Sequence, residues 1–194
     1  NGGNESGAIF YNLGNSYFKN KQLGKAILNY ERAQRLIPRD IDMGSNYKFA
    51  LMAVASRVDP VPNFFDKMWS GHVRSYTINE MFLILALILI FSGVVHLFGL
   101  YWKWPATLVV LGILAIFFLI FVIGLVMKIG FEKDANVAIK STAARFEPSD
   151  KATIYFELPE GQKVYFQTTE GDWLKIQRPD GKIGWVPRDT VERI

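Results

Sequence analysis

The stretch MFLILALILIFSGVVHLFGLY (Met81–Tyr101) is followed, after four residues, by ATLVVLGILAIFFLIFVIGLVM (Ala106–Met127). Neither run contains Asp, Glu, Lys or Arg, and each supplies the roughly 20 apolar residues that a helix needs to cross a bilayer. The four connecting residues, WKWP, allow only a tight reversal between two antiparallel helices. The sequence therefore predicts a transmembrane helical hairpin over residues 78–130, with a soluble segment on each side of it.

Length, charge and cysteine content narrow the possible functions. The chain has 194 residues, begins with Asn1 rather than Met, and carries a net charge of +4 that is spread thinly. Because it begins with Asn1, we expect a fragment or a processed chain. We expect no nucleic-acid partner, because no basic stripe with interleaved aromatics is present. The absence of cysteine excludes disulfides, thiolate chemistry and cysteine-ligated metals.

Two amphipathic helical patterns precede the hairpin. Apolar residues recur at helical spacing from Gly7 to Asn20 and again from Gln22 to Leu36, and Pro38 ends the second pattern. Small residues, Gly14 and Ala26, lie where the two helices must approach closely. The bulky residues expected in the seam between the helices are Phe10, Leu13, Tyr17 and Tyr30.

This arrangement resembles a tetratricopeptide repeat over one full period, Gly7–Asp40. The signature positions of that family hold Phe10, Leu13, Gly14, Tyr17, Ala26, Tyr30, Ala33 and Pro38. One period later, Ile41–Arg57 is typical of a degenerate helix that caps a solenoid, with Tyr47 and Leu51 in the seam and Lys48 where a packing glycine would be. Because such arrays usually need at least three repeats, we expect further repeats upstream.

The resemblance implies a groove that binds extended peptides, with Tyr11, Asn15 and Asn46 as candidate contacts. Asn15 and Asn46 match the two asparagines of the family members that clamp a peptide carboxylate. Tyr11, however, occupies the position of the first clamp lysine, and the third repeat that would supply the other cations is absent. A true ligand contact and an ordinary groove surface are both open interpretations.

The segment between the repeat and the hairpin, residues 58–77, is predicted to be a linker. The prolines of Asp59–Asn63 cannot continue a helix. We expect the residues that follow to lie on the lipid headgroups, with a loop packed on the repeat as the alternative. The apolar and basic residues of this interfacial segment are Phe64, Phe65, Lys67, Met68, Trp69 and Arg74.

Polar and aromatic residues of the hairpin are further candidates. Trp102, Lys103 and Trp104 are predicted to lie at the membrane interface, which suits two aromatics and a cation. His96 is the one ionisable residue within either apolar run, and it has either a structural role or a hydrogen bond to another helix or partner. Two spans cannot enclose a pore, so we do not expect this chain to transport a solute unaided.

Short β-rich runs separated by turns follow Asp134. The predicted strands are Val137–Lys140, Ile154–Leu158, Lys163–Gln167, Trp173–Gln177 and Ile183–Pro187. Asp180-Gly181 between two alternating strands indicates a hairpin in which Gly181 takes a positive φ. About 60 residues of such strands predict a small, partly open barrel.

The order of these pieces resembles a bacterial SH3 domain over residues 136–194. The family pattern is carried by Ala143–Ala144, Arg145–Pro148, Leu158–Gly161, Asp172–Ile176 and Gly181–Val186. The resemblance implies Trp173, Trp185 and Arg145 as ligand candidates. The alternatives are core packing of the tryptophans and an ion pair of Arg145 with Glu147, Asp150 or Glu157. The acidic, tyrosine-rich loop of the proline-binding relatives is missing, so no PxxP groove is expected.

No catalytic constellation is present in the sequence. His72 and His96 lie outside the two soluble segments, and the chain has no P-loop, GxSxG or HExxH motif. We therefore expect a protein that is not an enzyme and that holds no cofactor or metal.

The predicted fold is that of a multidomain membrane protein in four parts. These are an α-helical solenoid end with a capping helix (1–57), the linker (58–77), the two-helix transmembrane hairpin (78–130) and a small all-β SH3-like barrel (131–194).

This combination resembles the BatE-type proteins of the Bacteroides aerotolerance (Bat) operons. The resemblance implies a non-catalytic scaffold in the bacterial inner membrane. Its partners would be peptide segments of other membrane proteins, among them Bat proteins with von Willebrand A domains. The alternatives are an envelope sensor whose SH3 domain binds peptidoglycan or cell-wall peptides, and an accessory subunit of a transporter.

The membrane topology follows in part from the hairpin. A short link places both soluble segments on one side of the membrane. The cations near the spans are Lys67, Arg74, Lys128, Lys133 and Lys140, and by the positive-inside rule they modestly favour cytoplasmic soluble segments. Lys103 in the short tip opposes this, and the Bat resemblance implies an upstream signal peptide. We expect the soluble segments to lie in the periplasm.

Overall fold

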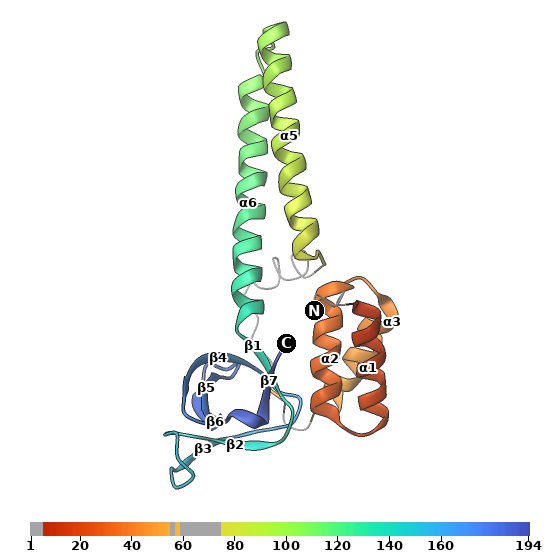
Figure 1. Cartoon of the computed structure of the whole chain (residues 1–194). Coiled ribbons are helices and arrows are strands. Elements are labelled where there is room, and N and C mark those ends of the chain that lie inside the picture. The colour runs from red at the N-terminus through yellow and green to blue at the C-terminus, as the bar shows by residue number, and fades with distance from the viewer. Residues whose placement is uncertain (1–5, 55–56, 59–74) are drawn as a thin grey trace. The chain divides into compact units, whose positions relative to one another are not determined.

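The computed structural model describes residues 6–54, 57–58 and 75–194, which form two compact units (Figure 1). One unit joins the described residues up to 58 to Glu132–Ile194, and the other contains the described residues from 75 to 131. Most of the predicted linker lies outside the described residues. This applies to Phe64, Phe65, Lys67, Met68, Trp69, His72 and Arg74.

The first unit begins with the two helices expected from the sequence, α1 (Gly7–Lys19) and α2 (Leu23–Leu36). The turn between them places Lys21 in the left-handed region with φ 58°. A third helix, α3 (Ile41–Met52), begins where the Asp40 side chain accepts a hydrogen bond from the Met43 N–H at 2.8 Å. The helix α3 ends at Met52, so the prediction that it continues to Arg57 is wrong.

The seam between α1 and α2 follows the predicted pattern, with one exception. A Cβ added at Gly14 would lie 2.7 Å from the Tyr30 ring, so this position has no room for a side chain. Ala26 and Tyr30 are buried, as expected. Leu13 was expected in the seam but is 40% exposed, because no described element covers its side of α1.

The second unit is the predicted hairpin, formed by α5 (Ile78–Trp102) and α6 (Thr107–Lys133), which lie side by side (Figure 1). Both helices are long and apolar enough to cross a membrane. The Thr77 hydroxyl and the Glu80 carboxylate form a capping box that starts α5. The residues that pack between the helices are Met81, Leu85, Phe118, Phe121, Val122 and Leu125.

The second half of the first unit is a seven-stranded antiparallel sheet with the order β3-β2-β6-β5-β4-β1-β7. Its strands are β1 (Ala135–Ala138), β2 (Thr142–Arg145), β3 (Ile154–Leu158), β4 (Lys163–Glu170), β5 (Trp173–Gln177), β6 (Ile183–Pro187) and β7 (Val191–Arg193). The first strand begins and ends two residues earlier than predicted, since its pairing starts with Ala135 opposite Tyr165 and it stops at Ala138. The strand β7 was not predicted.

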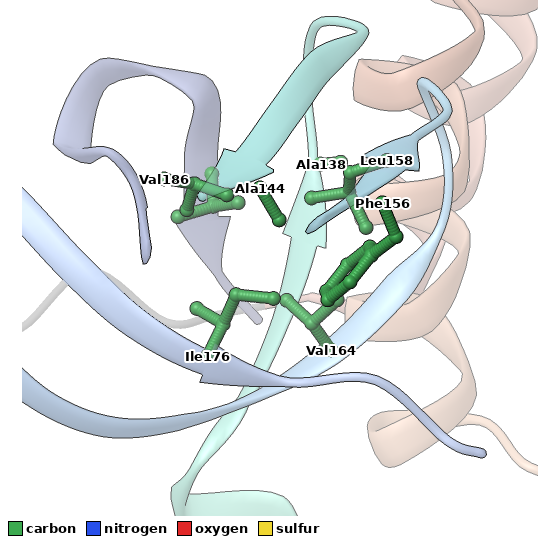
Figure 2. Close-up of a cluster of buried hydrophobic side chains, with 8 residues drawn as sticks. Ala138, Ala144, Phe156, Leu158, Val164, Ile176 and Val186 are labelled. Atoms are coloured by element: carbon green, nitrogen blue, oxygen red, sulfur yellow. The ribbon is translucent and has the colours of Figure 1, made fainter. Parts of the chain in front are cut away.

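The core of the sheet is made of small and aliphatic side chains and one phenylalanine, which face one another in Figure 2. Its members include Ala138, Ala144, Phe156, Leu158, Val164, Ile176 and Val186. Gly184 lets β2 and β6 approach, because a Cβ there would lie 3.1 Å from that of Ala144. Gly181 has φ 87°, which confirms the predicted hairpin at Asp180-Gly181.

Candidate functional site

The structure brings together the three residues that the sequence singled out on the helical repeat. Asn46 of α3 donates both amide hydrogens, one to the Tyr11 hydroxyl at 2.9 Å and one to Asn15 Oδ1 at 3.0 Å. The Tyr30 hydroxyl donates to the same Asn15 oxygen at 2.7 Å. We call Tyr11, Asn15 and Asn46 the amide cluster.

The amide cluster leaves specific polar groups available. Asn15 Nδ2 and Asn46 Oδ1 make no hydrogen bond to the described residues, and Asn46 is exposed. An amide donor and an amide acceptor side by side complement the C=O and N–H of an extended peptide backbone. The cluster contains no cation, so it lacks the charge that would clamp a free carboxylate.

An aromatic pair that the sequence analysis did not single out lies further along the same two helices. The rings of Phe18 and Phe49 meet edge to face with centroids 5.7 Å apart, and Phe49 is 63% exposed. Phe18 follows Asn15 by three residues and Phe49 follows Asn46 by three, so helical spacing could have identified the pair. The amide cluster and the aromatic pair together define the α1–α3 face.

The buried Tyr30 side chain holds Asn15 of the amide cluster in place through its hydroxyl. Its side chain is buried at 1% exposure against Gly14, and its ring lies near those of Tyr11 and Tyr47. Burial, and to a lesser degree the neighbouring Tyr11, raises the pKa of the Tyr30 phenol. Tyr30 therefore remains protonated at neutral pH and keeps donating to Asn15, which fixes the orientation of that amide.

The three SH3 ligand candidates lie on one face of three neighbouring strands. Lys175, Trp185 and Arg145 form a cross-strand row, because each pairs with the next in register on β5, β6 and β2. Trp173 lies two residues before Lys175, on the same side of β5. Their neighbours Ile176, Val186 and Ala144 point into the core, so this row faces outward.

Two members of the row are already engaged within the barrel. Trp185 is only 9% exposed, and Lys175 Nζ lies 5.6 Å from the centroid of its ring. Arg145 donates to the carbonyl of Ala152 at 2.5 Å, in place of the ion pair with Glu147, Asp150 or Glu157 that was considered from the sequence. Trp173 is half-buried and keeps part of its ring exposed.

The hairpin tip carries the predicted interface residues. Phe98 stacks on Trp102 with centroids 4.3 Å apart and meets Trp104 edge to face at 6.1 Å. Lys103 has φ 52°, which ends α5 in a left-handed turn between the two indoles. His96 is exposed on α5, one residue beyond the buried Val95.

The described residues do not assemble a metal centre. Within residues 6–54, 57–58 and 75–194, no group of three or more His, Asp or Glu side chains is placed to hold a metal ion. The site residues at hand are therefore amide, phenol and aromatic groups, whose chemistry is hydrogen bonding and stacking.

Two protein families match the segments on either side of the hairpin. The tetratricopeptide repeat family matches residues 8–40, and the bacterial SH3 domain family matches residues 140–192. No curated protein matches the chain. The chain thus combines a segment similar to a tetratricopeptide repeat, a hairpin of two apolar helices suited to a membrane, and a barrel similar to bacterial SH3 domains.

Proposed function

We propose that this protein is a non-catalytic, membrane-anchored scaffold whose α1–α3 face binds an extended peptide segment of another protein. The observation that carries this proposal is the amide cluster. Tyr11, Asn15 and Asn46 come from two helices, hold one another in place, and leave a donor and an acceptor free. Both families found in the chain are consistent with protein or peptide partners.

The chemistry of the α1–α3 face suggests which part of a peptide it recognises. Asn15 Nδ2 donates to a main-chain carbonyl and Asn46 Oδ1 accepts from a main-chain N–H, which is independent of the peptide's side chains. The exposed Phe49 ring, next to Phe18, then contacts an apolar side chain of the same peptide. A free terminal carboxylate is not required, since Tyr11 stands where a clamp would place a cation.

The membrane topology is part of the proposal. That the first compact unit contains residues from before and after the hairpin supports a topology in which both ends of the hairpin emerge on one side of the membrane. We place that side in the periplasm of a bacterial inner membrane, as the resemblance to the BatE-type proteins implies. The partners would then be other Bat-type membrane proteins, including those with von Willebrand A domains.

Co-purification of the full chain in mild detergent tests the scaffold. We expect defined membrane proteins to be recovered with the parent and to be reduced at least about tenfold with the double variant Asn15→Ala and Asn46→Ala. The loss of two or three hydrogen bonds of about 1 kcal/mol each accounts for that reduction. Asn12→Ala is the matched control, because Asn12 is an exposed residue of the same helix α1.

The proposal fails if the double variant recovers the same proteins as the parent. It also fails if Asn12→Ala loses them equally, because the effect would then not belong to the amide cluster. Circular dichroism of each variant shows whether the helices remain folded.

A second function is supported by one observation on the barrel. Trp173 keeps part of its ring exposed on the outward face and pairs in register with Pro187. An exposed indole of this kind can stack on a cell-wall peptide, which would make the protein an envelope sensor. Sedimentation of the full chain with purified sacculi, lost on Trp173→Ala, would support this function, and equal sedimentation of both proteins would remove it.

A further inference from the structure

The barrel and the helical repeat share a buried apolar contact within the first compact unit. Val137 of β1 is completely buried, and it belongs to the same cluster as Ile27 of α2, Ala50 of α3 and Val54, which follows α3 by two residues. Ile139 and Ile194 pack against the same cluster. Residues from both sides of the hairpin therefore complete one hydrophobic core.

Gly161 shows how closely the two parts fit. Its φ is 84°, and a Cβ at this position would lie 2.7 Å from Ile27 Cδ1 and 2.9 Å from Val54 Cγ2. The neighbouring Gln162 is 1% exposed and pairs with the main chain of Val58 through both its amide nitrogen and its amide oxygen, at 3.0 and 2.8 Å. This turn of the barrel is thus shaped to its helical neighbour.

A buried carboxylate joins three elements at the same contact. Glu31 of α2 accepts a hydrogen bond from the Tyr47 hydroxyl of α3, and Lys163 Nζ of β4 lies 2.8 Å from its other oxygen. The Glu31 side chain is only 11% exposed, so both partners compensate for its desolvation. Glu160 adds a hydrogen bond from the Gly24 N–H at 2.7 Å.

Two arginines of α2 cover the edge of the sheet. Arg32 donates to the Arg193 carbonyl at 2.7 Å and pairs with Glu192 at 2.9 Å, both on β7. Arg35 donates to the carbonyl of Ile194, just after β7, at 2.8 Å and to that of Glu132, near the end of α6, at 2.7 Å. Burial lowers the pKa of Arg35 from that of a free guanidinium, though it remains charged at neutral pH. These side chains cover the edge strand β7, which could otherwise pair with a strand of another chain.

From these contacts we propose that the barrel is the terminal cap of the helical repeat and holds α3 in its place. In a solenoid each repeat is stabilised by its neighbours, and the last one needs a cap. Here β1 and the turn at Gly161 pack on α2 and on Val54 just after α3, and Lys163 of β4 reaches Tyr47 of α3 through Glu31. The barrel thus takes the place beside α2 that a following repeat would occupy in a solenoid.

The cap has a consequence for the α1–α3 face, and this step rests on the proposed function. Tyr47 donates its hydroxyl hydrogen to Glu31, the residue that pairs with Lys163 of the barrel. In α3, Tyr47 is adjacent to Asn46 of the amide cluster. Holding Tyr47 fixes the helix that carries Asn46. A peptide bound at the α1–α3 face then depends on barrel residues that it does not contact.

Hydrogen exchange of the full chain in detergent, read by mass spectrometry, tests the cap without any peptide. The variants Gly161→Ala and Gly181→Ala form a matched pair, because φ is 84° and 87° and both substitutions strain the backbone alike. Only at Gly161 does the new methyl group meet Ile27 of α2 and Val54 just after α3, whereas nothing lies within 4 Å of it at Gly181. We expect amides of residues 41–54 to exchange at least about tenfold faster in Gly161→Ala and at the parental rate in Gly181→Ala.

A polar variant makes the test independent of backbone strain. Lys163→Ala should also speed exchange in α3, and Lys151→Ala, an exposed lysine of the same barrel, should not. Parental protection of α3 in both Gly161→Ala and Lys163→Ala would overturn the proposal. Equal acceleration in Gly161→Ala and Gly181→Ala, with the barrel core amides at parental rates, would overturn it as well. If Gly161→Ala and Lys163→Ala lose peptide binding while α3 exchanges at the parental rate, the proposed function stands and the proposal that the barrel is a cap is rejected.

Discussion

The α1–α3 face and the outward row of the barrel are both built from residues that the sequence marked as ligand candidates, but they differ in what they leave available. In the amide cluster, Asn15 and Asn46 bind each other and still present one donor and one acceptor. In the barrel, Trp185 is covered and Arg145 is bound to a carbonyl. The first arrangement leaves hydrogen-bonding groups available to an external ligand, whereas the side chains of the second are mainly engaged within the barrel.

Residue type alone does not identify a binding site. Tryptophan and arginine are common in binding sites, yet here Trp185 stands between Lys175 and Arg145 and contributes to the packing of the barrel. Asparagine on a helix surface is an ordinary residue, yet two of them meet here because α1 and α3 lie side by side. The available hydrogen-bonding groups separate the two cases.

The largest expected effect comes from removing a covered side chain of the barrel row. Trp185→Ala should destabilise the barrel by about 3 kcal/mol, because truncating a buried tryptophan removes much apolar contact and leaves a cavity. Trp173→Ala should cost roughly 1 kcal/mol, since its ring is only half-buried. Pulse proteolysis of the full chain across a urea series measures both midpoints.

This measurement decides which of the two tryptophan substitutions destabilises the barrel more. A smaller shift for Trp185→Ala than for Trp173→Ala would mean that Trp185 is not part of the packed fold. The contrast between a self-contained barrel row and an open α1–α3 face would then be lost.

The next effect lies beneath the amide cluster. Gly14→Leu should destabilise the helical repeat by roughly 1–3 kcal/mol, because even a Cβ would meet the Tyr30 ring at 2.7 Å. The displaced Tyr30 would also release its hydrogen bond to Asn15. Gly44→Leu is the control, as Gly44 is a helical glycine with nothing within 4 Å, and it should stabilise slightly.

Thermal unfolding of the helical signal compares these two variants. Equal midpoints would show that Gly14 is not at a close contact and that Tyr30 does not support the amide cluster. A loss confined to Gly14→Leu would confirm the seam as the foundation of the α1–α3 face.

Much of the fold could be predicted from the sequence because its signals are local. The two apolar runs, the helical spacing around Gly14 and the Asp180-Gly181 turn each depend on neighbouring residues. The joining of barrel and repeat could not be predicted in this way. Val137 and Ile27 are far apart in sequence, and nothing in either segment states that they share a core.

The candidate site was predicted in its members but not in its chemistry. Family register placed Tyr11, Asn15 and Asn46 together, and they do meet. The hydrogen-bond directions, and the exposure of Phe49 beside them, depend on how α3 lies against α1. The prediction that Leu13 is buried in the seam was wrong for a related reason. A position typical of a seam is buried only where a neighbouring element covers it.

The smallest expected effect concerns an ion pair at the end of the barrel hairpin, another contact that the barrel makes with itself. Arg178 binds both oxygens of Asp180, at 2.9 and 2.6 Å, and its guanidinium also lies 4.6 Å from the centroid of the Phe156 ring. The hydrogen bond from Arg178 is the main cause that lowers the pKa of the Asp180 carboxyl below its usual value of 3.8. The same bond raises the pKa of Arg178.

A carboxyl with a lowered pKa in the folded state contributes stability above its unfolded pKa, and that stability is lost as the pH falls through the folded value. Asp180→Asn should therefore lower the urea midpoint of the barrel at pH 7 by an amount equivalent to about 0.5 kcal/mol, since the pair is partly exposed to solvent. The difference from the parent should shrink as the pH falls below about 4. Asp189→Asn is the control, because Asp189 and its partner Lys140 are both more than 60% exposed, and we expect a smaller shift at pH 7. A constant difference for Asp180→Asn from pH 7 to pH 3 would assign its effect to the shape of the turn, and the ion pair would no longer count among the contacts that make the barrel self-contained.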